Sequence, residues 1–253
     1  MTKLLTISTL IILFNSITLA QSQDTVDLAE KRHLSSHQFA YKKIIAPAFL
    51  IGYGIYGLYN NDLQQINLNI RSEVVKSVKR KIHADDYLQF APAVSVYALN
   101  LVGINGRHNL RDRTLILSTS TIIMLGAMLS IKSLSNIERP DGTSLHSFPS
   151  GHSSNAFMGA EFLWQEYRNE SIWYGIVGYL VASTTGILRM YNNRHWLTDV
   201  TMGAGLGILS TKIAYWVYPW IDKKLTKKPH FAAMKFSPVV YDKSVGLAFY
   251  MKL

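Results

Sequence analysis

Residues 149–167 read PSGHSSNAFMGAEFLWQEY, a stretch that joins a Pro-Ser-Gly turn to a mainly apolar segment. This change predicts a helix whose N-cap and first-turn residues are Ser150 and Gly151. The first turn of a helix presents backbone N–H groups without intrahelical partners and a partial positive charge. Because Gly151 has no side chain, an oxyanion could approach these groups closely. The sequence therefore predicts a phosphate site at this turn, directly before His152.

Apolar segments surround this helix, and several approach the roughly 17–25 residues that a helix needs to cross a bilayer. With the central one, they cover residues 44–59, 87–104, 114–131, 153–167, 171–188 and 197–220. Glycines repeat in Gly52–Gly57 and Gly203–Gly207, which allows helices to approach closely. No strand precedes these glycines, so they do not indicate a dinucleotide loop. The pattern predicts an all-α, membrane-embedded bundle of about six helices.

The composition limits the possible classes of protein. Of 253 residues, 48% are hydrophobic and 17% are charged, against roughly 25% charged in soluble domains, which excludes intrinsic disorder. The absence of cysteine excludes disulfides, thiol catalysis and cysteine-bound metals. The net charge of +10 fits anionic lipid or phosphate-bearing substrates. No nucleic-acid partner is predicted, because the cations flank apolar segments instead of forming an exposed stripe.

The two ends of the chain differ in composition from the predicted bundle. Residues 1–20 have a positive residue, a short apolar run and small residues near Ala20, which predicts a secretory signal peptide or, alternatively, an uncleaved anchor. A polar segment at 21–43 precedes the bundle at 44–220. Residues 221–253 form a basic linker and a tail, whose alternating apolar residues predict a short, weak pair of β-strands.

The segment Asn61–Asp86 differs from its neighbours, since apolar and basic residues are interleaved along it. This pattern suits an amphipathic helix that lies on an anionic surface. An ordinary surface helix would show the same pattern, so both interpretations stay open.

Most chemically useful residues lie in two windows at segment ends, residues 132–152 and 189–199. Three cations in these windows, Lys132, Arg139 and Arg189, would repel one another at one end of a bundle unless an anion lay between them. A guanidinium is suited to binding two oxygens of a phosphate. The windows therefore predict that these cations, with Ser150 and Gly151, bind a phosphate.

The same windows hold groups that could break a phosphate ester. Such a reaction needs a nucleophile and a proton for the leaving group, and His152 and His195 could supply both. Asp199 lies four residues beyond His195, one turn away if that stretch is helical. Its carboxylate could hold one ring nitrogen of His195 and leave the other free to attack phosphorus.

These residues resemble the motifs of the type 2 phosphatidic acid phosphatase (PAP2) family, whose site is similar to that of vanadium-dependent haloperoxidases. The motif Lys-x6-Arg-Pro corresponds to Lys132–Pro140, Pro-Ser-Gly-His to 149–152, and Arg-x5-His-x3-Asp to Arg189–Asp199. The resemblance covers about residues 87–218. Leu188 departs from the family, which has a serine before the arginine.

The resemblance implies a role for each site residue. His195 would be the nucleophile that forms a phosphohistidine, Asp199 would orient it, and His152 would protonate the leaving group. The phosphate would be bound by Lys132, Arg139, Ser150, Gly151 and Arg189. No metal or cofactor is implied, and the sequence has no recognisable metal-ligand spacing. His146 and Arg194 are interpreted as groups that order the loops.

The resemblance implies a lipid phosphate monoester or pyrophosphate as substrate: phosphatidate, phosphatidylglycerol phosphate, undecaprenyl pyrophosphate or a phosphate of lipid A. The alternatives are a soluble, secreted acid phosphatase of broad specificity, a haloperoxidase and an anion-binding membrane transporter. Short apolar segments, with Glu161 and Glu166 in the fourth, keep the soluble enzyme open. The spacing of His195 and Asp199 argues against a transporter, because anion capture needs no nucleophile. The oligomeric state is left open.

The basic links predict the orientation in a bacterial-type inner membrane. Residues 107–113, Arg168 and 223–228 would be cytoplasmic by the positive-inside tendency, so that the site faces the periplasm. A soluble periplasmic protein is the alternative. If every apolar segment crosses the membrane once, the start of segment 44–59 lies in the cytoplasm. A cleaved signal peptide would instead place that start outside. Either the N-terminal run is retained, or segment 44–59 does not cross, or fewer than six segments span.

Overall fold

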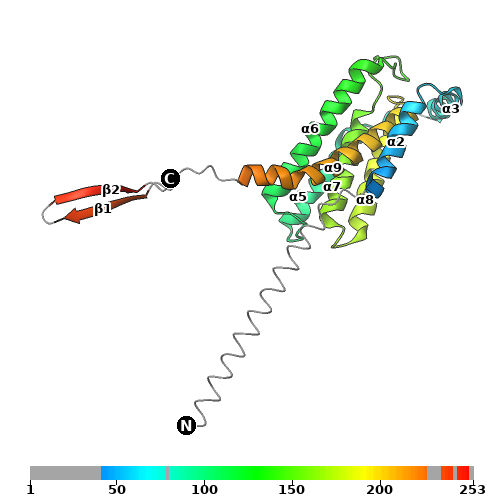
Figure 1. Ribbon diagram of the computed structural model, residues 1–253. Helices are drawn as coiled ribbons and strands as arrows, with labels where there is room; N and C mark the ends of the chain where they lie inside the picture. Colours follow the sequence, from blue (N-terminus) through cyan, green and yellow to red (C-terminus); the bar gives the residue numbers. More distant parts are fainter. Residues whose placement is uncertain (1–40, 78–79, 227–234, 242–243, 251–253) are drawn as a thin grey trace, which may run out of the picture. The chain divides into compact units, whose positions relative to one another are not determined.

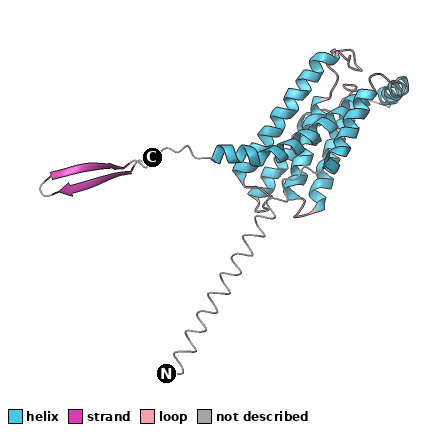
Figure 2. Ribbon diagram, viewed as in Figure 1, coloured by secondary structure: helices cyan, strands magenta, loops and turns pink. Residues whose placement is uncertain are grey.

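The computed structural model describes residues 41–77, 80–226, 235–241 and 244–250. The predicted signal peptide or anchor and most of the polar segment lie outside the described residues. The chain divides into two units at Ile45 and Ala46, and the site lies entirely in the second, Ala46–Leu253. In the described part of that unit, helices form a bundle and two strands form a hairpin (Figures 1 and 2).

The long helices coincide with the six predicted apolar segments. They are α2 (Ile45–Tyr56), α5 (Ala91–Leu101), α6 (Leu110–Ser135), α7 (Gly151–Tyr167), α8 (Ile172–Tyr191) and α9 (Leu197–Thr226). The shorter or more polar elements are the 3-10 turn η1 (Tyr41–Ile44), α3 (Asn61–Ser77) and α4 (Asp85–Leu88). The strands β1 (Lys235–Tyr241) and β2 (Ser244–Tyr250) pair antiparallel within the predicted tail, with Lys235 opposite Tyr250. The prediction of an all-α bundle is confirmed.

Helix α7 is the centre of the bundle. It begins after Ser150, whose side chain accepts a hydrogen bond from the Ser153 N–H, so the predicted N-cap is confirmed. Helices α5, α6, α8 and α9 all pack against α7, and most of its side chains are buried. This arrangement keeps the first turn of α7 fixed at one end of the bundle, which we call the site end.

Glycines allow α9 to lie close to α7, as predicted. A Cβ atom at Gly203 would lie 2.6 Å from the Ser150 carbonyl oxygen, and one at Gly207 would overlap with the Ser154 carbonyl. Any larger residue there would force the two helices apart. Their close approach brings Asp199 beside the start of α7, where its carbonyl oxygen accepts the Ser150 N–H at 3.0 Å.

The helix predicted over Asn61–Asp86 is present over Asn61–Ser77 but does not continue to Asp86. Helix α3 ends at Ser77, and a separate short helix, α4, begins at Asp85. The buried residue of α3 is Asn67, whose side-chain amide donates to Thr198 Oγ1 at 3.1 Å. A polar contact with the start of α9 therefore docks this helix, while apolar residues such as Ile66 and Leu68 remain exposed. The break before α4 allows its acidic residues to enter the site end.

Among the described helices, only α6 is both long and apolar enough to cross a membrane. Its most apolar window has a mean hydropathy of 1.9, and 22% of that window is buried inside the protein. Helix α2 has 12 residues. At about 1.5 Å per residue it is shorter than the roughly 30 Å hydrocarbon core, so α2 alone cannot cross. Length and hydropathy thus do not support six independent spans.

Candidate active site

The two predicted windows meet at the site end of the bundle. Lys132 comes from the last turn of α6, His152 from the first turn of α7, and Arg189 from the last turn of α8. His195 lies in the loop before α9, and Asp199 in the first turn of α9. Helices that run alternately up and down the bundle therefore collect residues far apart in the sequence.

His195 is held by a buried carboxylate. Its Nδ1 lies 3.3 Å from Asp199 Oδ2, which also accepts the Trp196 N–H at 2.9 Å and the Ser147 hydroxyl. The spacing suggested that His195 and Asp199 lie one helical turn apart. His195 instead precedes α9, which begins only at Leu197. Asp199 nevertheless accepts the Nδ1 proton and leaves Nε2 with its lone pair. Nε2 has no hydrogen-bond partner among the residues that the structure describes, as a nucleophile requires.

The environment of His195 keeps its ring neutral. Burial lowers the pKa of His195 from 6.5 to about 4, since 3% of the residue is exposed. Asp199 opposes this shift, and the positive charges of Arg189 and Lys132 lower the pKa further. At neutral pH the imidazole is therefore unprotonated, the form that can attack phosphorus.

This pKa predicts a pH-dependent contribution to stability. Between pH 6.5 and about 4 the unfolded chain takes up a proton at His195 that the folded chain does not. The contribution of the neutral His195 ring to the stability of the fold is full above pH 6.5, the pKa of the unfolded chain. It falls as the pH decreases from 6.5 to about 4. We expect wild-type protein to lose more thermal stability than His195→Gln between pH 7.5 and 5. Melting temperatures of both proteins at the two pH values test this, and equal losses would contradict it.

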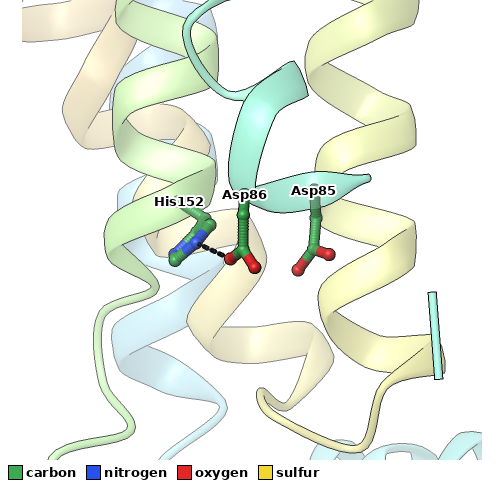
Figure 3. Close-up of side chains that lie close together, drawn as sticks. All are labelled: Asp85, Asp86 and His152. Atoms are coloured by element: carbon green, nitrogen blue, oxygen red, sulfur yellow. Dashed lines mark hydrogen bonds and ion pairs between the residues drawn. The ribbon is translucent and has the colours of Figure 1, made fainter. Parts of the chain in front are cut away.

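Two acidic residues that the sequence did not assign complete the site. Asp85 Oδ2 lies 2.6 Å from Arg189 Nη1, and Asp86 Oδ1 lies 2.9 Å from His152 Nε2. Figure 3 shows the Asp86 carboxylate beside the His152 ring and the Asp85 carboxylate on the other side of Asp86. The prediction that an external anion must separate the three cations is thus corrected for Arg189, because Asp85 neutralises it from within the chain. Asn192 also donates to Asp85 Oδ1 at 3.2 Å.

Arg139 and Lys132 differ in how their charges are satisfied. Lys132 Nζ donates to the His146 carbonyl oxygen at 2.8 Å. The buried Nε of Arg139 has no hydrogen-bond partner among the described residues. Burial first, and then the charges of Arg189 and Arg194, lower the pKa of the Arg139 guanidinium. A guanidinium that has a buried, unpaired N–H and lies near other positive charges is suited to bind an anion from outside the protein.

The first turn of α7 contains both the N-cap of the helix and backbone N–H groups that could donate to a phosphate. Ser150 is fully buried, and its Oγ accepts a hydrogen bond from Ser153 Oγ at 3.0 Å. Its own N–H is taken by Asp199, so this donor is not available to a phosphate. The next N–H groups, of Gly151 and His152, have no backbone acceptor earlier in the helix. The predicted phosphate cradle can therefore consist of these two donors and the Ser150 hydroxyl.

The surrounding loops are tied to one another by polar contacts. Arg194 Nη1 lies 3.1 Å from Asp141 Oδ2, which joins the loop before α9 to the loop after α6. The His146 side chain is exposed, and its carbonyl holds Lys132. The Arg194 contact agrees with its interpretation as a loop-ordering group, whereas His146 contributes its backbone carbonyl, so a role for its side chain stays a prediction.

Asp85, Asp86 and His152 also form a candidate set of metal ligands, with donor atoms within 4.8 Å of one another. All three side chains are already engaged, Asp85 with Arg189, and Asp86 and His152 with each other. A metal ion would be repelled by the adjacent guanidinium. The donor set fits a hydrogen-bonded network better than a metal centre. The expectation that the site needs no metal stays a prediction.

Glu161 and Glu166 lie near the other end of α7 and are paired there. Glu161 Oε1 lies 2.7 Å from Lys212 Nζ, and Glu166 Oε1 lies 2.7 Å from His108 Nδ1. These acids link α7 to its neighbours and are separated from His152 by more than two helical turns. They are not part of the candidate site.

Parts of this chain are similar to known proteins. Residues 113–223 match the family model described as the PAP2 superfamily. Over 152 residues the chain is 38% identical to a Porphyromonas gingivalis protein named lipid A 1-phosphatase. The aligned part is 57% of this chain and 34% of that protein, so the chain spans about a third of the length of this curated relative.

Two solved structures are also similar to the chain. Aquifex aeolicus LpxE has a TM-score of 0.45 and 22% identity, covering 59% of this chain and 94% of the other. The first transmembrane PAP2 type phosphatidylglycerolphosphate phosphatase from Bacillus subtilis has a TM-score of 0.43 and 21% identity, covering 73% and 99%. The family match contains Lys132, Arg139, His152, Arg189 and the pair of His195 and Asp199. The similarity to the PAP2 superfamily thus covers residues 113–223, the part of the chain that contains these residues.

Proposed function

We propose that the protein is a phosphatase that hydrolyses a lipid phosphate monoester or pyrophosphate through a phosphohistidine on His195. The observation that carries the proposal is the state of His195: a buried carboxylate holds Nδ1, and Nε2 is left free. An anion-binding transporter would need the cations but not this arrangement. The phosphates of lipid A are the first substrates to test, because the relative at 38% identity bears that name.

Each group would have a defined task in the reaction. The phosphate would bind Arg139, Lys132, Arg189 and the first turn of α7. His195 Nε2 would attack phosphorus, forming an N–P bond while the P–O bond to the lipid breaks. His152 would give its proton to the departing oxygen. It would then take a proton from a water molecule that attacks the phosphohistidine, which releases inorganic phosphate and restores His195.

The surface of the bundle supports a membrane location for this enzyme. Apolar side chains project from α6, where Ile122 is 71% and Leu134 is 81% exposed. A second exposed group lies on α8, including Trp173, Val177 and Leu180. Exposed apolar areas of this kind are typical of proteins that contact lipid or another partner. The acids of α7 are paired with Lys212 and His108, so they do not oppose this location.

The distribution of basic residues supports a periplasmic site. Helix α7 begins at the site end and reaches Arg168 at its other end. The Arg107 N–H donates to the Glu166 carbonyl oxygen at that end, and Arg111 bonds Asp222 near the end of α9 at 2.9 Å. The links at 107–113, Arg168 and the end of α9 therefore lie opposite the catalytic residues, while Arg80 and Lys81 lie at the site end, where Ile82 bonds Asn192. By the positive-inside tendency, the basic end would be cytoplasmic and the site periplasmic.

The proposed function is tested by phosphate release from purified protein. The panel contains lipid A, phosphatidate, phosphatidylglycerol phosphate, undecaprenyl pyrophosphate and a water-soluble aryl phosphate, each with and without EDTA. We expect a lipid to be preferred and EDTA to have no effect. Preference for the soluble ester, with release of the protein by a detergent-free wash, would support a secreted acid phosphatase instead. Phosphate binding without any release would favour a transporter.

A further inference from the structure

The contacts of Asp86 set it apart from the other acids at the site end. Its Oδ1 lies 2.9 Å from His152 Nε2 (Figure 3). The same oxygen lies 3.8 Å from Arg189 Nη1, while Oδ2 lies 3.8 Å from the exposed His83 Nδ1. Asp86 thus connects α4 with the first turn of α7 and the last turn of α8. It precedes residues 113–223, so the family match assigns it no role.

The bond to Asp86 determines which nitrogen of His152 can act. A carboxylate accepts only, so His152 Nε2 must carry the proton in this bond. The hydrogen bond from His152 lowers the pKa of Asp86, which therefore stays ionised. The other nitrogen, Nδ1, has no hydrogen-bond partner among the residues that the structure describes. It is the atom that remains to exchange a proton with a substrate.

Asp86 also offsets an unfavourable charge. Burial first, and then the charge of Arg189, lower the pKa of His152, whereas the hydrogen bond to Asp86 and its negative charge oppose this shift. A leaving-group acid must carry a proton on the nitrogen that faces the substrate while Nε2 remains protonated, so the ring must become positive. An anionic carboxylate between the imidazole and the guanidinium stabilises that charged form.

We propose that Asp86 is the positioning residue of His152: it binds Nε2, stabilises the imidazolium and leaves Nδ1 to protonate the departing oxygen. The inference rests on the proposed function, in which His152 is the acid. During P–O cleavage the Nδ1 proton moves to the lipid oxygen and the ring becomes neutral. The attacking water later returns a proton to Nδ1. Asp86 remains an anion throughout and does not contact the substrate.

The test uses Asp86→Asn and two substrates with different leaving groups. A positioned acid matters for an alkyl phosphate, whose alkoxide needs a proton, and matters little for a nitrophenyl phosphate, whose phenolate leaves without one. We expect Asp86→Asn to slow alcohol release in the first turnover of an alkyl phosphate by about 10²-fold. Nitrophenol release in the first turnover should change little. Asp86→Glu should recover part of the loss, because it restores the carboxylate.

Two further variants separate the role from other effects. His152→Ala should show the same dependence on leaving group, and adding Asp86→Asn to it should cause little further loss. Glu73→Gln is the matched control, since Glu73 is an exposed acid that pairs with Lys76 on α3. It should leave both rates unchanged. Melting temperatures of all variants show whether the fold is retained.

The outcomes distinguish this inference from the function on which it rests. Equal slowing of both substrates by Asp86→Asn, or no slowing of either, would overturn the role of Asp86 while phosphatase activity stands. Loss of wild-type alkyl phosphatase activity in EDTA would also overturn it, because Asp86 and His152 would then be metal ligands. Wild-type protein that releases phosphate from neither substrate would overturn the proposed function and this role together.

Discussion

Replacing His195 with alanine is expected to lower phosphate release by at least about 10⁴-fold, because the reaction loses its nucleophile. Binding of inorganic phosphate should remain, since Arg139, Lys132 and the first turn of α7 are unchanged. Turnover of the preferred lipid phosphate and calorimetric binding of phosphate are the two measurements. A variant with near wild-type turnover would refute the assigned role of His195.

The buried position of His195 calls for a second variant. Alanine leaves a small cavity beside Asp199 and removes the partner of its carboxylate. His195→Gln keeps most of the volume and can donate a hydrogen bond to Asp199. Both variants should be inactive, and the glutamine variant should melt at the higher temperature. Activity lost only in a variant that has lost its fold would point to a structural role.

Replacing Arg139 with alanine is expected to lower kcat/KM by about 10²–10³-fold, because a donor to the transferred phosphate is lost. The same change should raise the melting temperature, since Arg139 Nε is buried without a partner and its charge faces Arg189 and Arg194. Arg139→Lys should recover only part of the activity, because an ammonium cannot reproduce the two-pronged geometry of a guanidinium. Turnover and thermal unfolding are measured on the same preparations.

Arg189 provides the matched comparison for Arg139. Its guanidinium is paired with the buried Asp85 at 2.6 Å. Arg189→Ala would leave that carboxylate buried without its cation, which destabilises a protein strongly. We therefore expect both variants to lose activity but to change the melting temperature in opposite directions. A fall in melting temperature for Arg139→Ala would show that Arg139 also supports the fold.

Much of the bundle and of the site could be predicted from local patterns. Apolar segments mark helices, and the N-cap at Ser150 depends on residues within one turn. His195 and Asp199 are close in the sequence, so their contact needs only a short connection between a loop and a helix. The cations lie in the same two windows of the sequence, and the family resemblance, supported by the match over residues 113–223, agrees with their predicted role.

Asp85 and Asp86 were missed because they were read as the end of a single helix over Asn61–Asp86. One feature of the sequence could have found them. Both precede the second apolar segment, and in an alternating bundle that segment begins at the same end at which the third one stops. The alternating direction of successive helices would thus have placed the two acids at the same end of the bundle as Lys132.

The amino-acid sequence by itself determined the helices, the cap of α7 and the set of groups able to attack and bind a phosphate, because each depends on residues a few positions apart. Only the tertiary structure decided which charges are paired. The partners of His152 and Arg189 lie 66 and 104 positions away. Contacts over such separations arise from the packing of whole helices, so a local pattern could not show that Asp85 neutralises Arg189 or that Asp86 holds His152.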